Sequence, residues 1–253
     1  MKNKTVFLTG ASSGIGEGLA IEMAKRGATL GLLARREDIL DDLAQRCAEL
    51  GGTARVFAAD VTDADAVKKA ANGFRAEFGR IDIMIANAGI GGSADARDLD
   101  IEKATQIINV NLIGAVNSVG AVLPQMIERR SGQMVAISSL AGYRGLPRSS
   151  AYCASKAGVS NFFESLRLDL RGSGVDITII HPGFIKTPLT AGRENKMPFL
   201  MELEDGVKKI LTIIEKKKKS AAFPFPLSTL VRAGNFFPVW LYDRIAGGAN
   251  FRE

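Results

Sequence analysis

Short apolar runs alternate with longer amphipathic segments along almost the whole chain. The runs carry few internal polar positions, which is typical of parallel strands that are buried on both faces. The segments between them repeat apolar residues at helical spacing, for example at Ile15, Leu19 and Met23. The predicted strands are Thr5 to Thr9, Thr29 to Ala34, Arg55 to Ala59, Ile81 to Ala86, Met134 to Ile137, Asp176 to Ile180 and Ala221 to Phe225. This alternation predicts an α/β fold, a doubly wound parallel sheet with helices on both faces.

The first predicted strand leads directly into a glycine-rich segment, GASSGIG at residues 10–16, and then into a helix. Glycines let the backbone turn sharply and approach a pyrophosphate, which the free N–H groups of a helix N-terminus attract. The order of strand, glycine turn and helix therefore predicts a phosphate-binding turn. The alternative is a turn in which the glycines serve only tight packing of strand against helix.

The second predicted strand ends at Ala34 and is followed by Arg35 and Arg36. A site for NAD usually places an acidic residue here to bind the ribose 2′-hydroxyl, whereas arginine suits a 2′-phosphate through charge-assisted hydrogen bonds. The alternative is a pair of solvated arginines, but the start of the next helix is an unfavourable place for cations. We therefore predict NADP(H) as the cofactor, with Arg35 as the main contact.

Polar or small residues also follow the next two predicted strands. Asp60-Val61 follows the third strand, where the adenine is expected, and Asn87-Ala88-Gly89 follows the fourth, where small residues allow close approach of a ligand.

Asn111 is embedded in the long helix predicted over residues 101–130, whose apolar side is expected to carry Ile108, Leu112, Val116, Val119 and Leu123. If Asn111 is buried, it must bond either to backbone groups at a kink or to waters in a site.

Tyr152 and Lys156 stand four residues apart among good helix formers, so one helical face carries both. An ammonium beside a phenol favours the phenolate and lowers a tyrosine pKa from about 10 towards working pH, where the tyrosine can exchange a proton with a substrate oxygen. Ser138 and Ser139 follow the predicted strand that ends at Ile137, and ligands of open α/β sheets bind at the carboxyl ends of strands. A surface tyrosine and lysine on an amphipathic helix would produce the same short pattern.

His181, the only histidine, directly precedes Pro182-Gly183 at the end of a predicted strand. We expect it to pack in the fold and not to act as a base. Residues 184–200, with Thr187, form a loop long enough to be a lid over a substrate.

The segment after residue 225 is apolar and aromatic and contains the only tryptophan, Trp240. Three interpretations stay open: it covers the substrate pocket and lies in a subunit interface, it is plain core, or it lies on a membrane surface beside the lysine run of residues 216–219. The lysines have a simpler explanation, because cations at a helix C-terminus are favourable. We divide the chain into residues 1–225, a dinucleotide-binding and catalytic unit, and residues 226–253, a C-terminal extension of the same domain.

Composition narrows the classes of function. The length of 253 residues fits one α/β domain, and the 33 basic against 27 acidic residues are a mild bias that indicates no nucleic-acid partner. Cys47 and Cys153 are too few for a disulfide framework, and neither has the neighbouring Cys or His residues that a metal site needs. We therefore expect a reduced compartment and no metal. We find no apolar leader and no spanning run free of charge or proline, and expect a cytoplasmic protein.

Six motifs together resemble the short-chain dehydrogenase/reductase family in its compact form, from Lys4 to about Phe225. They are TGASSGIG at 9–16, NAG at 87–89, NVNLIG at 109–114, ISSLAG at 137–142, YCASK at 152–156 and HPGFIKT at 181–187. The resemblance implies a Rossmann fold and an active site of Asn111, Ser139, Tyr152 and Lys156. The family's serine precedes its tyrosine by thirteen residues, which selects Ser139 over Ser138.

The resemblance also implies the role of each residue. Tyr152 gives its proton to the carbonyl oxygen that a hydride transfer reduces, and Ser139 hydrogen-bonds that oxygen. Lys156 binds the nicotinamide ribose and lowers the tyrosine pKa, while Asn111 holds a water that links Lys156 to solvent. The implied cofactor contacts, with their neighbours in the same turns, are Gly10, Ser12, Ser13, Gly14, Ile15, Gly16, Arg35, Arg36, Asp60, Val61, Asn87, Ala88, Gly89, Tyr152, Lys156, Pro182, Gly183, Ile185 and Thr187.

We therefore expect an NADP(H)-dependent carbonyl reductase that interconverts a ketone and a secondary alcohol. The side chains of Phe199, Phe236, Phe237 and Trp240 favour a lipophilic substrate. The alternative is an NADP(H)-binding regulatory or scaffold protein, which would have no reason to keep a pKa-tuned phenol. Members of the family commonly form dimers or tetramers through the helices that carry Asn111 and Tyr152, so we expect a homodimer or homotetramer.

Overall fold

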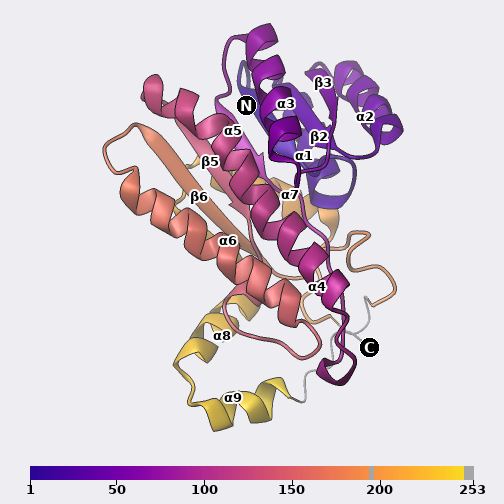
Figure 1. Ribbon diagram of the computed structural model, residues 1–253, viewed down its shortest axis with the longest axis vertical. Helices are drawn as coiled ribbons and strands as arrows, with labels where there is room; N and C mark the ends of the chain where they lie inside the picture. The colour runs from indigo at the N-terminus through magenta and orange to yellow at the C-terminus, as the bar shows by residue number, and fades with distance from the viewer. Residues whose placement is uncertain (194–196, 248–253) are drawn as a thin grey trace.

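Seven strands form a single parallel sheet at the centre of the molecule (Figure 1), in the order β3-β2-β1-β4-β5-β6-β7. The computed structural model describes residues 1–193 and 197–247, so part of the predicted loop (194–196) and the end of the predicted extension (248–253) lie outside the described residues. The strands are β1 (Thr5–Thr9), β2 (Thr29–Ala34), β3 (Thr53–Ala58), β4 (Ile83–Ala86), β5 (Gly132–Ile137), β6 (Val175–Pro182) and β7 (Ser220–Phe223). The predicted doubly wound parallel sheet is confirmed.

Helices cover both faces of this sheet because successive strand residues point to opposite sides. In β1, Val6 and Leu8 join one hydrophobic cluster, while Phe7 between them joins the other. The first cluster includes α1 (Gly14–Ala24), α2 (Glu37–Glu49) and α7 (Leu203–Glu215). The second includes α3 (Ala64–Phe78), α5 (Gly114–Glu128) and α6 (Ser150–Asp169). The central strands β1, β2, β4 and β5 carry no charged residue, because they are buried on both faces.

The long helix predicted over residues 101–130 is interrupted. It consists of α4 (Ile101–Ile108), a π-helical turn (Asn109–Ile113) and α5. The π-turn contains one more residue per turn than an α-helix, so it shifts the buried face of α5 relative to that of α4. The apolar side predicted from a single continuous α-helix therefore does not match the buried face. Of the predicted stripe only Val119 is buried; the buried apolar residues are Ile107, Ala115, Val119, Val122 and Met126.

The same stretch, Ile101–Glu128, is long and apolar enough to cross a membrane by length and composition alone. The sequence had led us to expect no stretch that could span a membrane, and by this criterion that expectation was wrong. Core helices have the same composition, and this one packs on β4, β5, α3 and α6.

Two short helices, α8 (Leu227–Ala233) and α9 (Val239–Ala246), follow β7 and lie beyond the carboxyl edge of the sheet (Figure 1, yellow). A 3₁₀ turn, Gly234–Phe236, joins them. Of residues 226–247, only Ser228, Gly234 and Ala246 are buried, so the interpretation of this segment as plain core was wrong. We call residues 226–247 the C-terminal cover.

Candidate active site

A cavity of about 750 Å³ lies at the carboxyl edge of the sheet. Parallel strands all end at this edge, so the turns that follow them converge on one space, where ligands of such sheets bind. All the predicted cofactor contacts line it except Gly16, and so do the predicted catalytic residues Ser139, Tyr152 and Lys156. Asn111 does not line it.

The glycine turn is packed tightly against the end of β4. A Cβ on Gly10, which has φ +67°, would lie 2.6 Å from the Cα of Ala88, and the side chain of Asn87 donates to the carbonyls of Thr9 and Gly10, both at 3.1 Å. A Cβ on Gly16 would lie 2.1 Å from the Gly10 oxygen, which explains why Gly16 supports the turn and does not face the cavity. The packing and ligand interpretations of these glycines are therefore compatible.

The end of the cavity near this turn carries positive charge. Arg36 Nη2 donates to Ser12 Oγ at 2.9 Å and to the Ser12 carbonyl at 3.2 Å, so its guanidinium lies on the glycine turn. Arg35 Nη1 lies 3.7 Å from a carboxylate oxygen of Asp60. The guanidinium groups of Arg35 and Arg36, beside this turn, fit a phosphate-bearing dinucleotide. The cavity lining also includes the charged residues Arg144, Lys156 and Arg193.

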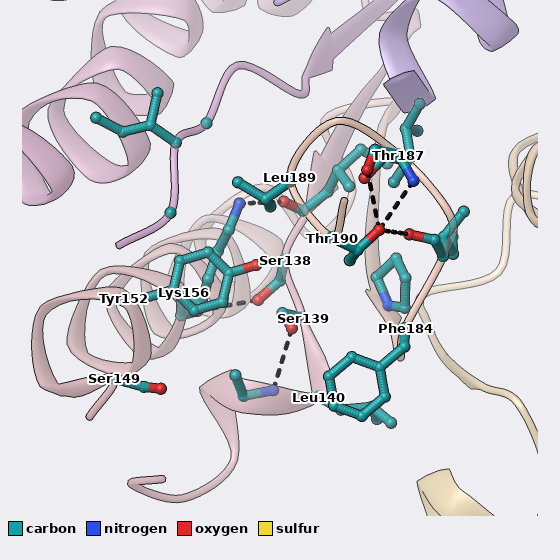
Figure 2. Close-up of a pocket in the computed structure, with 18 of the residues that line it drawn as sticks. Ser138, Ser139, Leu140, Ser149, Tyr152, Lys156, Phe184, Thr187, Leu189 and Thr190 are labelled. Carbon is teal, nitrogen blue, oxygen red and sulfur yellow. Dashed lines mark hydrogen bonds between the residues drawn. The ribbon is translucent and has the colours of Figure 1, made fainter. Parts of the chain in front are cut away.

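Tyr152 and Lys156 extend from the first turns of α6 towards the end of β5 (Figure 2). Lys156 is 5% exposed, and its Nζ donates to the Ile137 carbonyl at 2.9 Å. Burial lowers the pKa of Lys156 to about 8, because a desolvated ammonium is disfavoured. Lys156 Nζ lies 5.9 Å from the centroid of the Tyr152 ring. A positive charge is thus held beside the phenol inside the cavity.

The neighbouring serines have different surroundings. Ser138 is buried, and its Oγ donates to the Lys156 carbonyl at 3.0 Å and shares a 2.8 Å hydrogen bond with Ser160 Oγ. Ser139 is half-buried in the cavity wall, and its Oγ accepts from the Ala141 N–H at 3.1 Å (Figure 2). That bond uses acceptor capacity, so the Ser139 hydroxyl can still donate to a ligand.

Asn111 lies behind the cavity wall in the π-turn and is 1% exposed. Its Nδ2 donates to the Ile90 carbonyl at 3.0 Å and to Ser155 Oγ at 2.9 Å, and its Oδ1 accepts from the Ile90 N–H at 2.8 Å. Of the two explanations for a buried asparagine, these bonds support backbone partners at a kink. The water relay to Lys156 stays a prediction.

His181 packs against the Tyr143 ring, with centroids 4.7 Å apart, and is 5% exposed. Burial lowers the pKa of His181 to about 4, so the imidazole is neutral at neutral pH. These features agree with the expected packing role.

The aromatic residues expected to hold the substrate are mostly elsewhere. Phe199, Phe236 and Trp240 are exposed by 52%, 89% and 68% and do not line the cavity, whereas Phe237 does. Aromatic content does not tell which face of a short helix turns inward, so this expectation was wrong for three of the four residues. Aliphatic side chains line this end instead: Leu146, Met197, Leu227, Leu230, Val231 and Ile245.

The C-terminal cover therefore forms part of the cavity wall, as the first interpretation expected, while the subunit interface that this interpretation also expected stays a prediction. The lysine run of residues 216–219 precedes β7, whereas the cover follows the carboxyl end of that strand. The lysines and the cover thus lie at opposite ends of β7. The membrane interpretation expected them to lie beside each other, so it loses this support. Sequence reasoning also missed the lining residues Arg144 and Tyr242; the only available signal was their place after the 137–142 motif and in the aromatic tail.

One cavity at the carboxyl edge of the parallel sheet brings together a glycine turn, cationic side chains and the buried pair Tyr152 and Lys156. Together these features define a site for a dinucleotide-dependent oxidoreductase. The family model for short chain dehydrogenases matches residues 4–198. A Myxococcus xanthus protein described as an uncharacterized oxidoreductase is 44% identical over 97% of both chains. A solved short-chain type dehydrogenase/reductase from Mycobacterium marinum superposes with a TM-score of 0.80 at 27% identity, covering 87% of this chain and 92% of that one.

The Arabidopsis thaliana protein named 11-beta-hydroxysteroid dehydrogenase 1A is 41% identical over 75% of this chain, but the match spans only 54% of the plant protein. These similarities show that the chain belongs to the short-chain dehydrogenase family. It is an oxidoreductase of that family, which uses nicotinamide cofactors and acts on CH–OH groups.

Proposed function

We propose that this chain is an NADP(H)-dependent reductase that interconverts a lipophilic ketone and its secondary alcohol, with Tyr152 as the acid/base. The observation that carries the proposal is the position of Ser139, Tyr152 and Lys156 in one cavity. That cavity has an arginine-bearing glycine turn among its lining and aliphatic side chains from the C-terminal cover. A polar cofactor and an apolar substrate would thus meet at the catalytic group.

The proposed chemistry divides between cofactor and protein. When bound, the nicotinamide cofactor supplies or accepts the hydride. Tyr152 transfers a proton to or from the substrate oxygen, and Ser139 donates a hydrogen bond that holds that oxygen in place. Lys156 keeps a positive charge beside the phenol, which favours the phenolate after proton transfer. Its bond to the Ile137 carbonyl, 2.9 Å long, holds the ammonium in that position.

The preference for NADP(H) over NAD(H) rests on Arg35 and Arg36 after β2. Ala34 stands where an acidic residue would bind a 2′-hydroxyl, and both guanidinium groups line the cavity. Two guanidinium groups can neutralise a 2′-phosphate through charge-assisted hydrogen bonds. We assign the main contact to Arg35, because Arg36 is held by two hydrogen bonds to Ser12, whereas Arg35 has the looser contact, 3.7 Å to Asp60.

The lipophilic substrate is inferred from the apolar and mostly aliphatic wall that the C-terminal cover contributes. The hydroxysteroid names of the plant relatives point in the same direction, to a secondary alcohol on a bulky apolar skeleton. We propose a sterol-like or long-chain ketone as the substrate class.

We also propose a cytoplasmic homodimer or homotetramer that forms through α5 and α6. These helices expose large apolar side chains, with Ile127 44% and Leu168 53% exposed. Both cysteines are buried and in the thiol form, which suits a reduced compartment. Sedimentation or light scattering of the purified protein measures the assembly.

The function is tested by following NADPH and NADH oxidation with ketones graded from short aliphatic to long-chain and steroid-like. NADPH turnover that rises with substrate size and disappears in Tyr152→Phe supports the proposal. NADPH binding without turnover on any ketone would favour a regulatory cofactor-binding protein, and turnover retained in Tyr152→Phe would refute the assigned acid/base.

A further inference from the structure

Arg144 and Tyr242 connect two walls of the cavity that are far apart in the sequence. We propose that they form a clasp that holds the C-terminal cover against the loop preceding the catalytic helix α6. In this role they are positioning residues that set how tightly an apolar substrate is held, without taking part in proton transfer. The step from cover to substrate rests on the proposed function; the clasp itself does not.

The clasp consists of polar contacts from the loop to the cover and from the cover back to the loop. Arg144 Nη1 donates to the carbonyl of Gly234 at 2.6 Å and to that of Phe237 at 3.3 Å. The Arg144 guanidinium carbon lies 3.6 Å from the centroid of the Tyr242 ring, a cation–π contact. The Tyr242 hydroxyl donates to the Gly145 carbonyl at 2.6 Å, which returns the connection to the loop.

The loop side of the clasp is anchored in the core. Tyr143, the residue before Arg144, packs on the buried His181 ring at the end of β6. The Tyr143 N–H donates to the Leu140 carbonyl at 3.2 Å. Arg144 therefore extends from a fixed base, and the side of the clasp that can move is the cover.

The cover buries few of its own side chains. Only Ser228, Gly234 and Ala246 of residues 226–247 are buried, so the segment has almost no hydrophobic core of its own. Segments with few buried apolar side chains open locally at low free-energy cost. Under these conditions a pair of charge-assisted hydrogen bonds and a cation–π contact form a large part of what keeps the cover closed.

The position of the cover affects the substrate end of the cavity directly. Its inward-facing side chains, among them Leu227, Val231 and Phe237, line the cavity together with Leu146 of the clasped loop. Ser149 and Tyr152 follow that loop within the same stretch and also line the cavity. An open cover would remove apolar wall from the substrate while leaving Tyr152, Lys156 and Ser139 in place.

The clasp is tested by amide hydrogen exchange on Arg144→Met and Tyr242→Phe. Arg244→Met is the matched control, because it is the same substitution at an exposed position of α9. We expect exchange in residues 227–246 to accelerate about tenfold in Arg144→Met, less in Tyr242→Phe, which keeps the ring, and not at all in the control. If Arg144→Met does not fold, Tyr242→Phe carries the test.

Kinetics then separate the clasp from the chemistry. For a long-chain ketone we expect KM to rise about three- to tenfold in Arg144→Met with kcat within about twofold, and little change for a short ketone. Unchanged exchange in residues 227–246 would overturn the clasp whatever the activity. Unchanged exchange with a loss confined to acidic substrates would show instead that Arg144 binds a substrate anion. If the wild type reduces no ketone, amide exchange still decides on the clasp, while the proposed function fails separately.

Discussion

Lys156 is the buried charge on which the proposed mechanism depends, and its burial has a measurable cost. The unfolded chain keeps this lysine protonated up to its ordinary pKa of 10.5, whereas burial lowers the folded-state pKa to about 8. Well below pH 8 both states are protonated, and the folded state bears the full cost of the desolvated ammonium. We therefore predict that Lys156→Met, which is similar in length and uncharged, makes the cofactor-free protein more stable while abolishing turnover.

The magnitude follows from the two pKa values. One pKa unit corresponds to about 1.4 kcal/mol, so a fall from 10.5 to about 8 corresponds to roughly 3 kcal/mol of unfolding free energy. The variant loses the hydrogen bond from Nζ to the Ile137 carbonyl, and bonds made by charged groups contribute about 1.5–3 kcal/mol. The methionine side chain of the variant would also bury additional apolar surface. A net gain of about 1–2 kcal/mol is expected at pH 7.

Urea unfolding of the wild type and Lys156→Met from pH 7 to pH 10.5 measures the effect. The advantage of the variant should be complete well below pH 8 and should shrink as pH rises towards 10.5, because the folded wild type loses the Lys156 charge at a lower pH than the unfolded wild type does. Lys69→Met, on the exposed face of α3, is the control and should show no such trend. A variant less stable than the wild type at pH 7, or an advantage independent of pH, would refute the reasoning.

Three further predictions concern other residues of the site. Because burial holds the pKa of His181 near 4, wild-type stability should fall by about 2–3 kcal/mol as pH drops from 6.5 to 4; His181→Phe should flatten this part of the pH curve in thermal unfolding. Gly89→Ala should lower kcat by about tenfold or more with little change in melting temperature, because the new Cβ would lie 3.3 Å from Lys156 Nζ and 3.2 Å from Asn111 Oδ1. Arg35→Ser should raise KM for NADPH about 10- to 100-fold and leave KM for NADH nearly unchanged, and equal changes for both cofactors would contradict the 2′-phosphate contact.

Several features of the fold were determined by local sequence alone. Strand and helix periodicity predicted the parallel sheet, because residues buried on both faces leave uninterrupted apolar runs. The glycine turn and the pair Tyr152 and Lys156 were equally visible, because a tight turn needs glycine and residues four apart share a helical face. These signals depend on neighbours within a few positions in the chain.

Other features were decided only by tertiary packing. The family spacing selected Ser139 over Ser138, but the surroundings of the two hydroxyls are set by packing, because Ser138 bonds to Ser160 and to the Lys156 carbonyl on α6. The π-turn around Asn111 arises where the asparagine bonds to Ile90, a partner from a distant turn. The aromatic tail gave no indication that Phe237 faces the cavity while Trp240 faces out. Which side of a short helix turns inward is decided by what it packs against, and here that is a loop nearly a hundred residues earlier, the one held by the bond from Tyr242 to Gly145.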